Sequence, residues 1–169
     1  GALLRTAANV QPARLALGLR SRLLAEGVRL FERSPVRSLS RHAVARTAAG
    51  SVRAEAAILA VNSATASFPG HRLSLAVASS HMVVTEPVPD VLDQLGWSGG
   101  ENIHDCRTLL RYFRTTRDRR IALGWGGGRM GFGGRRLDRL EVDRAAVSEA
   151  RDSLVRLFPA LRGRTIEHA

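Results

Sequence analysis

The glycine-rich stretch Gly126–Gly131 contains the spacing G-x-G-x-x-G, which in dinucleotide-binding proteins forms the turn around a pyrophosphate. That chemistry requires a helix to begin at the last glycine, because the helix N-terminus holds the phosphates. The residues that follow, Phe-Gly-Gly-Arg-Arg, do not begin a helix, and the sequence has no Lys-Ser or Lys-Thr pair for a P-loop. We interpret residues 114–125 as a hairpin and the glycines after it as the loop leading to the last helix, with an arginine- and glycine-rich nucleic-acid segment as the alternative.

Other residues that could do chemistry lack the pattern that the chemistry needs. The five histidines show no metal-ligand spacing, and Ser79-Ser80-His81 is not part of a G-x-S-x-G nucleophile turn. Glu101 and Asp105 could form a carboxylate pair, but their surroundings indicate a loop. Cys106 is the only cysteine, which excludes an internal disulfide and a cysteine-based metal cluster. A reducing, cytoplasmic setting is expected, and no catalytic residue or metal ligand can be assigned.

The charge of the chain suggests nucleic acid only at first sight. The formal net charge is +11, yet all 26 basic residues are arginine and they are spread from Arg5 to Arg164. A surface that binds phosphates usually includes lysine, so the arginines indicate a compositional bias. Hydrophobic residues make up 44% of the sequence, enough to bury a core, and no apolar run is long enough for a transmembrane helix.

The first part of the chain reads as an α/β layer. Residues 11–26 predict an amphipathic helix, with a proline in its first turn and Gly27 as its C-terminal cap. The continuous apolar run 56–61 predicts a strand covered on both faces, and Asn62 ends it at the kind of position where doubly wound sheets bind ligands. The other strands expected here are 28–31, 36–39, 44–47 and 51–54.

The second part reads as a sheet with one long helix. Residues 69–75 form a plausible linker, and the helix over 140–157 ends at Pro159. Strand 109–115 alternates so that Tyr112 and Arg114 share one face. The other elements expected are a strand over 76–85, one or two helical turns over 91–95, and a strand over 120–125.

The order of these elements resembles one known family. The segments that carry the resemblance are Val10-Gln-Pro-Ala-Arg-Leu15, Glu26-Gly-Val-Arg-Leu-Phe-Glu32, Val52-Arg-Ala-Glu-Ala-Ala-Ile-Leu-Ala-Val-Asn62, Met82-Val-Val-Thr-Glu-Pro-Val-Pro89, Leu110-Arg-Tyr-Phe-Arg-Thr-Thr-Arg-Asp118 and Leu157-Phe-Pro-Ala-Leu-Arg-Gly163. Together they resemble the FAD-dependent oxidoreductases of the D-amino acid oxidase type, which include glycine, sarcosine and γ-glutamylputrescine oxidases. The similarity covers essentially the whole chain.

The resemblance implies an α/β (α+β) fold and FAD as the cofactor. Residues 1–68 would be the later part of a Rossmann-like FAD-binding domain, and residues 69–169 an incomplete substrate domain with a mixed or antiparallel sheet. Family members are longer and carry their G-x-G-x-x-G turn earlier in the chain. The sequence is therefore expected to be an internal fragment, which by itself would be inactive. Its parent would oxidise the C–N bond of a small amine or amino acid by hydride transfer to FAD.

By the same resemblance, a few residues are assigned to sites. Val36 matches the valine whose backbone contacts the adenine end of FAD, and Ala60 with Asn62 matches the end of the strand that passes the dinucleotide. Tyr112 and Arg114 are expected to line the substrate cavity. The family turn Asp-Gly-Arg is here Asp118-Arg119-Arg120, which suggests a different turn type. The alternative functions are a basic nucleic-acid-binding module and an inactive truncated gene product.

Overall fold

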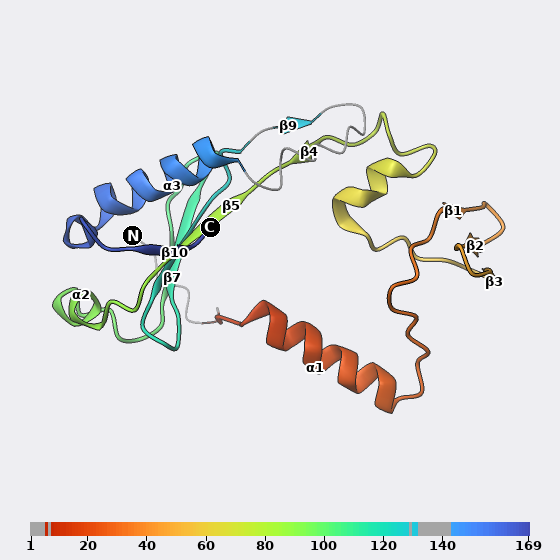
Figure 1. The fold of residues 1–169 in the computed structure, drawn as a ribbon, viewed down its shortest axis with the longest axis horizontal. Helices are drawn as coiled ribbons and strands as arrows, with labels where there is room; N and C mark the ends of the chain where they lie inside the picture. Colours follow the sequence, from red (N-terminus) through yellow and green to blue (C-terminus); the bar gives the residue numbers. More distant parts are fainter. Residues whose placement is uncertain (1–5, 7, 129, 132–142) are drawn as a thin grey trace. The chain divides into compact units, whose positions relative to one another are not determined.

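The computed structural model describes residue 6 and residues 8–128, 130–131 and 143–169 (Figure 1). These residues belong to two compact units. We call Val10–Leu75 the N-terminal unit, and Ala76–Ala169 with the residues before Val10 the sheet unit. None of the helices in the described part of the chain is long and apolar enough to cross a membrane.

The N-terminal unit begins with helix α1, Pro12–Ala25. The side chain of Gln11 accepts a hydrogen bond from the Arg14 amide at 2.7 Å, and Pro12 has no amide that needs a partner in the first turn. Gly27 follows the helix with a φ of 79°, a left-handed conformation that suits glycine at a helix end. Local sequence signals therefore place both ends of this helix where the sequence predicts them.

A small antiparallel sheet and a 3-10 helix make up the rest of the N-terminal unit. The sheet has the order β1-β2-β3, and Val44 pairs with Arg53 across the β2–β3 hairpin. The elements are β1 Ser38–Leu39, β2 Val44–Arg46, β3 Ser51–Arg53 and the 3-10 helix η1 Asn62–Ser67. Three of the predicted strands are thus confirmed in shortened form.

Two predicted strands of this unit are wrong. Residues 28–31 and 56–61 form no strand, and Ile58 in the middle of the apolar run is 94% exposed. A strand covered on both faces needs neighbouring strands to satisfy its backbone and helices to cover its side chains. Within the described part of the chain, no strand pairs with residues 56–61, and Ala66 is the only buried residue of the N-terminal unit. The apolar run therefore has the composition of a core strand, but in the described part of the chain it lacks the neighbouring strands that such a strand needs.

The sheet unit contains a five-stranded antiparallel sheet in the order β10-β5-β8-β7-β6. Its strands are β5 His81–Thr85, β6 Asn102–His104, β7 Arg111–Thr115, β8 Ile121–Trp125 and β10 Ile166–His168. The other elements are α2 Pro89–Gln94, α3 Arg144–Leu157, the 3-10 helix η3 Pro159–Leu161, and the strand pair β4 Val77–Ala78 and β9 Met130–Gly131. The mixed helix and sheet class predicted from the sequence is confirmed.

The core of the sheet unit lies between the sheet and helices α2 and α3. Val83, Leu123 and Phe113 lie side by side on β5, β8 and β7 and pack with Leu154 of α3. Trp97, Phe113 and Phe158 form an aromatic cluster, with ring centroids 5.4 to 6.1 Å apart. The helices therefore pack on one face of the sheet, while its other face carries the residues expected to bind substrate.

Helix α3 starts four residues later than the sequence suggested, at Arg144. The Asp143 carboxylate accepts the amides of Ala145 and Ala146 at 3.0 and 3.3 Å, which makes Asp143 the N-cap. The predicted start at Leu140 lies outside the described residues, as do Arg129 and residues 132–139 of the glycine-rich loop expected after Trp125. Residues 126–128 form no helix or strand, as expected, but Met130–Gly131 is strand β9, paired with β4, so the expected loop is wrong there. Gly131 itself lies in β9, so the last glycine of the G-x-G-x-x-G spacing is in a strand, which agrees with rejecting that motif.

The β7–β8 hairpin keeps the turn conformation that the substitution of glycine by Arg119 put in question. Arg119 has a φ of 60°, in the left-handed region that favours glycine. Its guanidinium donates to the carbonyl of Pro89 at 3.1 Å and pairs with Asp93 of α2. The expectation of a different turn type is therefore not supported, because the chain holds a non-glycine residue at a positive φ.

Candidate functional site

The face of the sheet opposite α3 carries the residues expected to line a substrate cavity. Tyr112 and Arg114 lie on this face of β7, and both are half-buried. Their neighbours on β8 are the small residues Gly124 and Ala122, in register with Tyr112 and Arg114 respectively. The alternation predicted for this strand is confirmed, because Phe113, between the two, points into the core against α3.

The hydroxyl of Tyr112 is part of a short chain of hydrogen bonds. The Tyr112 hydroxyl lies 3.0 Å from Oγ of Ser80, and Ser80 Oγ donates to the carbonyl of Trp125 at 3.3 Å. The Tyr112 ring lies directly over Gly124, because a Cβ at Gly124 would come within 2.1 Å of the ring carbon Cζ. Gly124 thus provides the space that lets the ring lie flat on β8 and reach Ser80.

Other glycines allow close approach around the same end of the sheet. A Cβ at Gly127 would lie 2.0 Å from the Trp125 indole, and one at Gly128 would lie 2.2 Å from Oγ of Ser79. Ser79 Oγ also lies 3.2 Å from Nε2 of His81, which is buried. The glycine stretch that resembles a phosphate-binding motif in sequence therefore serves side-chain packing here, beside the Tyr112–Ser80 pair.

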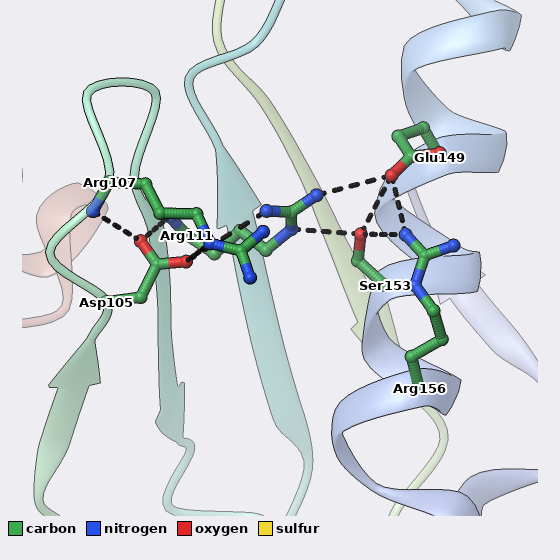
Figure 2. Close-up of polar contacts among 6 residues, drawn as sticks. All are labelled: Asp105, Arg107, Arg111, Glu149, Ser153 and Arg156. Carbon is green, nitrogen blue, oxygen red and sulfur yellow. Dashed lines mark hydrogen bonds and ion pairs between the residues drawn. The ribbon is translucent and has the colours of Figure 1, made fainter.

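On the opposite side of β7, a network of charged side chains connects the strand to α3. Figure 2 shows the Arg111 guanidinium between the β6–β7 loop and the helix. Arg111 donates to Ser153 Oγ at 2.9 Å and to Glu149 Oε1 at 3.3 Å, and it lies 5.9 Å from the Trp125 ring centroid. Arg156 also donates to Ser153 and Glu149, at 2.9 and 2.6 Å. The network fixes the strand that presents Tyr112.

The two carboxylates of this network are held in their charged form. The pKa of Asp105 lies below its usual range, chiefly because the Arg111 amide donates to the carboxylate at 2.9 Å. The pKa of Glu149 is also lowered, first by the hydrogen bond from Arg156. Asp105 therefore anchors the loop before β7 and is not paired with Glu101 as a catalytic carboxylate pair, and its neighbour Cys106 is exposed.

The residues expected to contact FAD lie in the N-terminal unit and are exposed. Val36 lies just before β1, and within the described part of the chain no hydrogen bond uses its amide or carbonyl. Ala60 and Asn62 lie where the apolar run turns into η1, and Asn62 has a φ of 48°. Close contact with a dinucleotide requires an accessible backbone and a small side chain, and the contacts of these three residues with FAD stay predictions.

The two segments that carry these residues converge on one depression. Its volume is about 250 Å³. Leu39, three residues after Val36, lines it together with Leu59, which directly precedes Ala60. The remaining lining residues are Ser40, Arg41, Phe68, Pro69 and His71. Neither Val36 nor Ala60 lines the depression itself, and their contacts with a cofactor remain predictions.

Sequence reasoning missed Ser80 and Gly124. Ser80 follows β4 in a segment with no motif, and Gly124 looks like one more glycine of a glycine-rich stretch. The available signal was a glycine in the interior of a predicted strand, which often marks a side chain or ligand that lies close to the backbone. Because Ser80 and Tyr112 are 32 positions apart, no local pattern predicts that their hydroxyls meet.

Comparison with known proteins identifies the family. The model of the DAO family, FAD dependent oxidoreductases, matches residues 1–169. The chain is 30% identical over 99% of its length to gamma-glutamylputrescine oxidoreductase of Escherichia coli (strain K12), covering 38% of that protein. It is 24% identical over 95% of its length to the probable oxidoreductase OrdL of Rhizobium meliloti (strain 1021), covering 36% of it.

No solved structure matches the chain. The chain spans less than two fifths of the length of the two curated relatives named above. The resemblance inferred from the order of sequence segments is confirmed by the family match along the entire chain, and FAD is the cofactor expected of this family. The chain belongs to the family of FAD-dependent oxidoreductases of the D-amino acid oxidase type.

Proposed function

We propose that the protein to which this chain belongs oxidises the C–N bond of an amine or amino acid, with FAD as the hydride acceptor. The observation that carries the proposal is the family match over residues 1–169, together with 30% identity to an oxidoreductase named for the amine γ-glutamylputrescine. In such enzymes the cofactor supplies the reactivity, and the protein supplies binding, orientation and exclusion of water. The residues of this chain would therefore bind and orient, and none is assigned a proton-transfer role.

The two compact units suggest how these tasks are divided. The N-terminal unit carries Val36, Ala60 and Asn62, and we assign it to the FAD side. The sheet unit carries Tyr112 and Arg114, and we assign it to the substrate side. The boundary between the units falls after Leu75, at the end of the expected linker.

Tyr112 and Arg114 would give the substrate face both polar and charged groups. A guanidinium presents several donors in a fixed plane and suits a carboxylate, which amino-acid substrates carry. A phenol hydroxyl can donate or accept a hydrogen bond, so it can meet either end of an amine or amino acid. The apolar neighbours Met82 and Val84 on β5 would contact the carbon skeleton.

The direct test is reduction of the bound flavin by substrate. The full-length protein, loaded with FAD, is mixed without oxygen with γ-glutamylputrescine, putrescine or glycine, and the visible flavin absorbance is followed. Bleaching by an amine or amino acid, but not by the corresponding alcohol, is the expected result. A protein that cannot be loaded with FAD, or whose flavin no amine or amino acid bleaches, would overturn the proposal.

A pair of variants tests the assignment of the FAD side. Ala60→Leu places a bulky side chain where close backbone approach is proposed, and Ala57→Leu makes the same change three residues earlier in the same exposed run. FAD affinity, measured by fluorescence titration of the apoprotein, should fall at least about tenfold for Ala60→Leu, a loss of about 1.4 kcal/mol. An equal loss for both variants would contradict a specific contact at Ala60.

The nucleic-acid alternative is weakened by ion pairs among the residues that the structure describes. In the sheet unit, Arg111, Arg120 and Arg156 pair with acidic side chains of their own chain. Binding to DNA or RNA with an affinity that falls steeply with salt concentration would be evidence for that alternative. A cytoplasmic location also remains a proposal, based on a single cysteine whose thiol is exposed.

A further inference from the structure

The hydrogen bonds around Tyr112 have a direction that the residue types determine. A backbone carbonyl only accepts hydrogen bonds, and a serine hydroxyl has a single proton to donate. A Ser80 proton directed at the Trp125 carbonyl, 3.3 Å away, leaves the Tyr112 hydroxyl as the donor in the 3.0 Å contact, in which either oxygen could otherwise donate. The order of donation is therefore Tyr112 to Ser80 to Trp125.

This direction leaves the Tyr112 oxygen as an acceptor. With its one proton directed at Ser80, the phenol oxygen has only lone pairs to offer a further partner. A partner with an N–H group, such as an amine, fits such an oxygen, whereas a carboxylate oxygen would face it lone pair to lone pair. A tyrosine that binds a carboxylate must direct its proton at the ligand, which is the opposite arrangement.

The surrounding residues hold this arrangement in place. Gly124 lets the Tyr112 ring lie on β8, and a Cβ there would come within 2.5 Å of the phenol oxygen. The backbone before Ser80 is held from the other side, where Gly128 packs against the side chain and carbonyl of Ser79. His81, directly after Ser80, is buried and paired with Trp125 across β5 and β8.

We propose that the Tyr112 oxygen accepts a hydrogen bond from the amino group of the substrate, and that Ser80 is the positioning residue that sets this polarity. The inference rests on the proposed function and adds to it which end of the substrate Tyr112 meets. Arg114, on the same face of β7, remains assigned to the carboxylate or other anionic end, where the substrate has one.

Three variants of the full-length protein test the polarity through binding. Tyr112→Phe removes the acceptor and should raise the KM for the amine substrate about tenfold, the usual scale for a hydrogen bond to a charged group. Ser80→Ala frees the Tyr112 proton, so it should raise the KM for the amine by roughly threefold. The same variant should bind benzoate, a carboxylate probe without an amino group, more tightly than the wild type. In the double variant, Ser80→Ala should add nothing to Tyr112→Phe.

The carboxylate measurement separates a polarity role from a merely structural one. A general loosening of the site would weaken binding of amine and benzoate alike, and independent roles would make the two substitutions additive. Either result would overturn the proposal. If no amine reduces the flavin of the wild-type protein, the proposed function fails, and the polarity of Tyr112 is then judged by spectroscopy alone.

Raman spectroscopy reads the polarity without cofactor or substrate. Tyr112 is the only tyrosine of the chain, and the difference spectrum between wild type and Tyr112→Phe isolates its ring doublet in the full-length protein. The intensity ratio of this doublet distinguishes a phenol that donates from one that accepts. We expect a donor signature in the wild type, lost in Ser80→Ala. An acceptor signature in the wild type would overturn the inference whether or not the protein oxidises amines.

Discussion

The packing of the Tyr112 ring on Gly124 leads to a stability prediction for Gly124→Ala. The substitution should destabilise the protein when Tyr112 is present and stabilise it when Tyr112 is replaced by alanine. Substitution Gly124→Ala adds one methyl group beneath the Tyr112 ring. That methyl would lie 2.1 Å from Cζ and 2.5 Å from the hydroxyl oxygen of Tyr112, where ordinary contacts begin at 3.4 Å. The ring must therefore move by more than about 1 Å, which also breaks its hydrogen bond with Ser80.

The expected cost follows from these two losses. Overpacking by one methyl group costs about 1–3 kcal/mol, and the lost hydrogen bond contributes about 1 kcal/mol. Alanine is favoured over glycine within a strand by about 0.5–1 kcal/mol, which offsets part of this. Gly124→Ala should therefore destabilise the protein by about 1–3 kcal/mol. In a Tyr112→Ala background the clash disappears, and the same substitution should stabilise by about 0.5 kcal/mol.

Urea unfolding of the 169-residue chain measures both values. Its two tryptophans, Trp97 and Trp125, both lie in the sheet unit, so their fluorescence reports the unfolding of that unit. Gly126→Ala is the matched control, because a Cβ there meets only the Leu110 carbonyl at 3.9 Å. It should be nearly neutral. Equal costs for Gly124→Ala with and without the Tyr112 side chain would refute the packing argument.

Three further predictions concern stability. Arg111→Met should destabilise the chain by about 2 kcal/mol, because Ser153 and Glu149 lose the hydrogen bonds from a guanidinium that is only 13% exposed. The same change at the exposed Arg107 should cost under about 1 kcal/mol, and equal urea midpoints for the two variants would contradict this. Arg119→Gly should be about 1 kcal/mol more stable than Arg119→Ala, because both lose the pair with Asp93 and only glycine adopts a φ of 60° without strain; thermal unfolding compares them. The pKa of Glu149 is lowered in the folded chain, so the stability that its charged form contributes is fully present above the unfolded pKa of about 4.3 and is lost as pH falls through the folded pKa. The difference in free energy of unfolding between wild type and Glu149→Gln should therefore be largest near pH 7 and shrink toward about pH 3 in urea titrations. A difference that stays constant with pH would contradict this linkage.

Much of the local structure follows from sequence signals that act over a few residues. A proline in the first turn and Gly27 after the last one predict α1, and both hold in the structure. Alternation along β7 predicts that Tyr112 and Arg114 share a face, because successive side chains of a strand point to opposite sides. The family can also be inferred from the sequence, because the order of the sequence segments indicates the same family that the match over residues 1–169 identifies.

Where the sequence misled, the missing information was a partner. Residues 56–61 have the composition of a buried strand, but no neighbouring strand lies within the described part of the chain, and an apolar run cannot form a sheet by itself. Helix α3 begins at Arg144, after the predicted start at Leu140, because the Asp143 side chain caps it. The apolar stripe used for the prediction does not show where the cap lies. The FAD contacts of Val36, Ala60 and Asn62 stay predictions, since they involve a molecule outside the chain.

Only the tertiary structure showed which groups the Tyr112 hydroxyl meets. The sequence predicts that Tyr112 and Arg114 share one face of a strand, but the direction proposed for the Tyr112 proton depends on Ser80, 32 residues earlier, and on the Trp125 carbonyl, 45 residues from Ser80. The glycines that sequence analysis read as loop material include Gly127 and Gly128, whose role is close packing. Sequence patterns encode the period and the ends of single elements, whereas hydrogen-bond polarity and close contact arise between elements far apart in the chain.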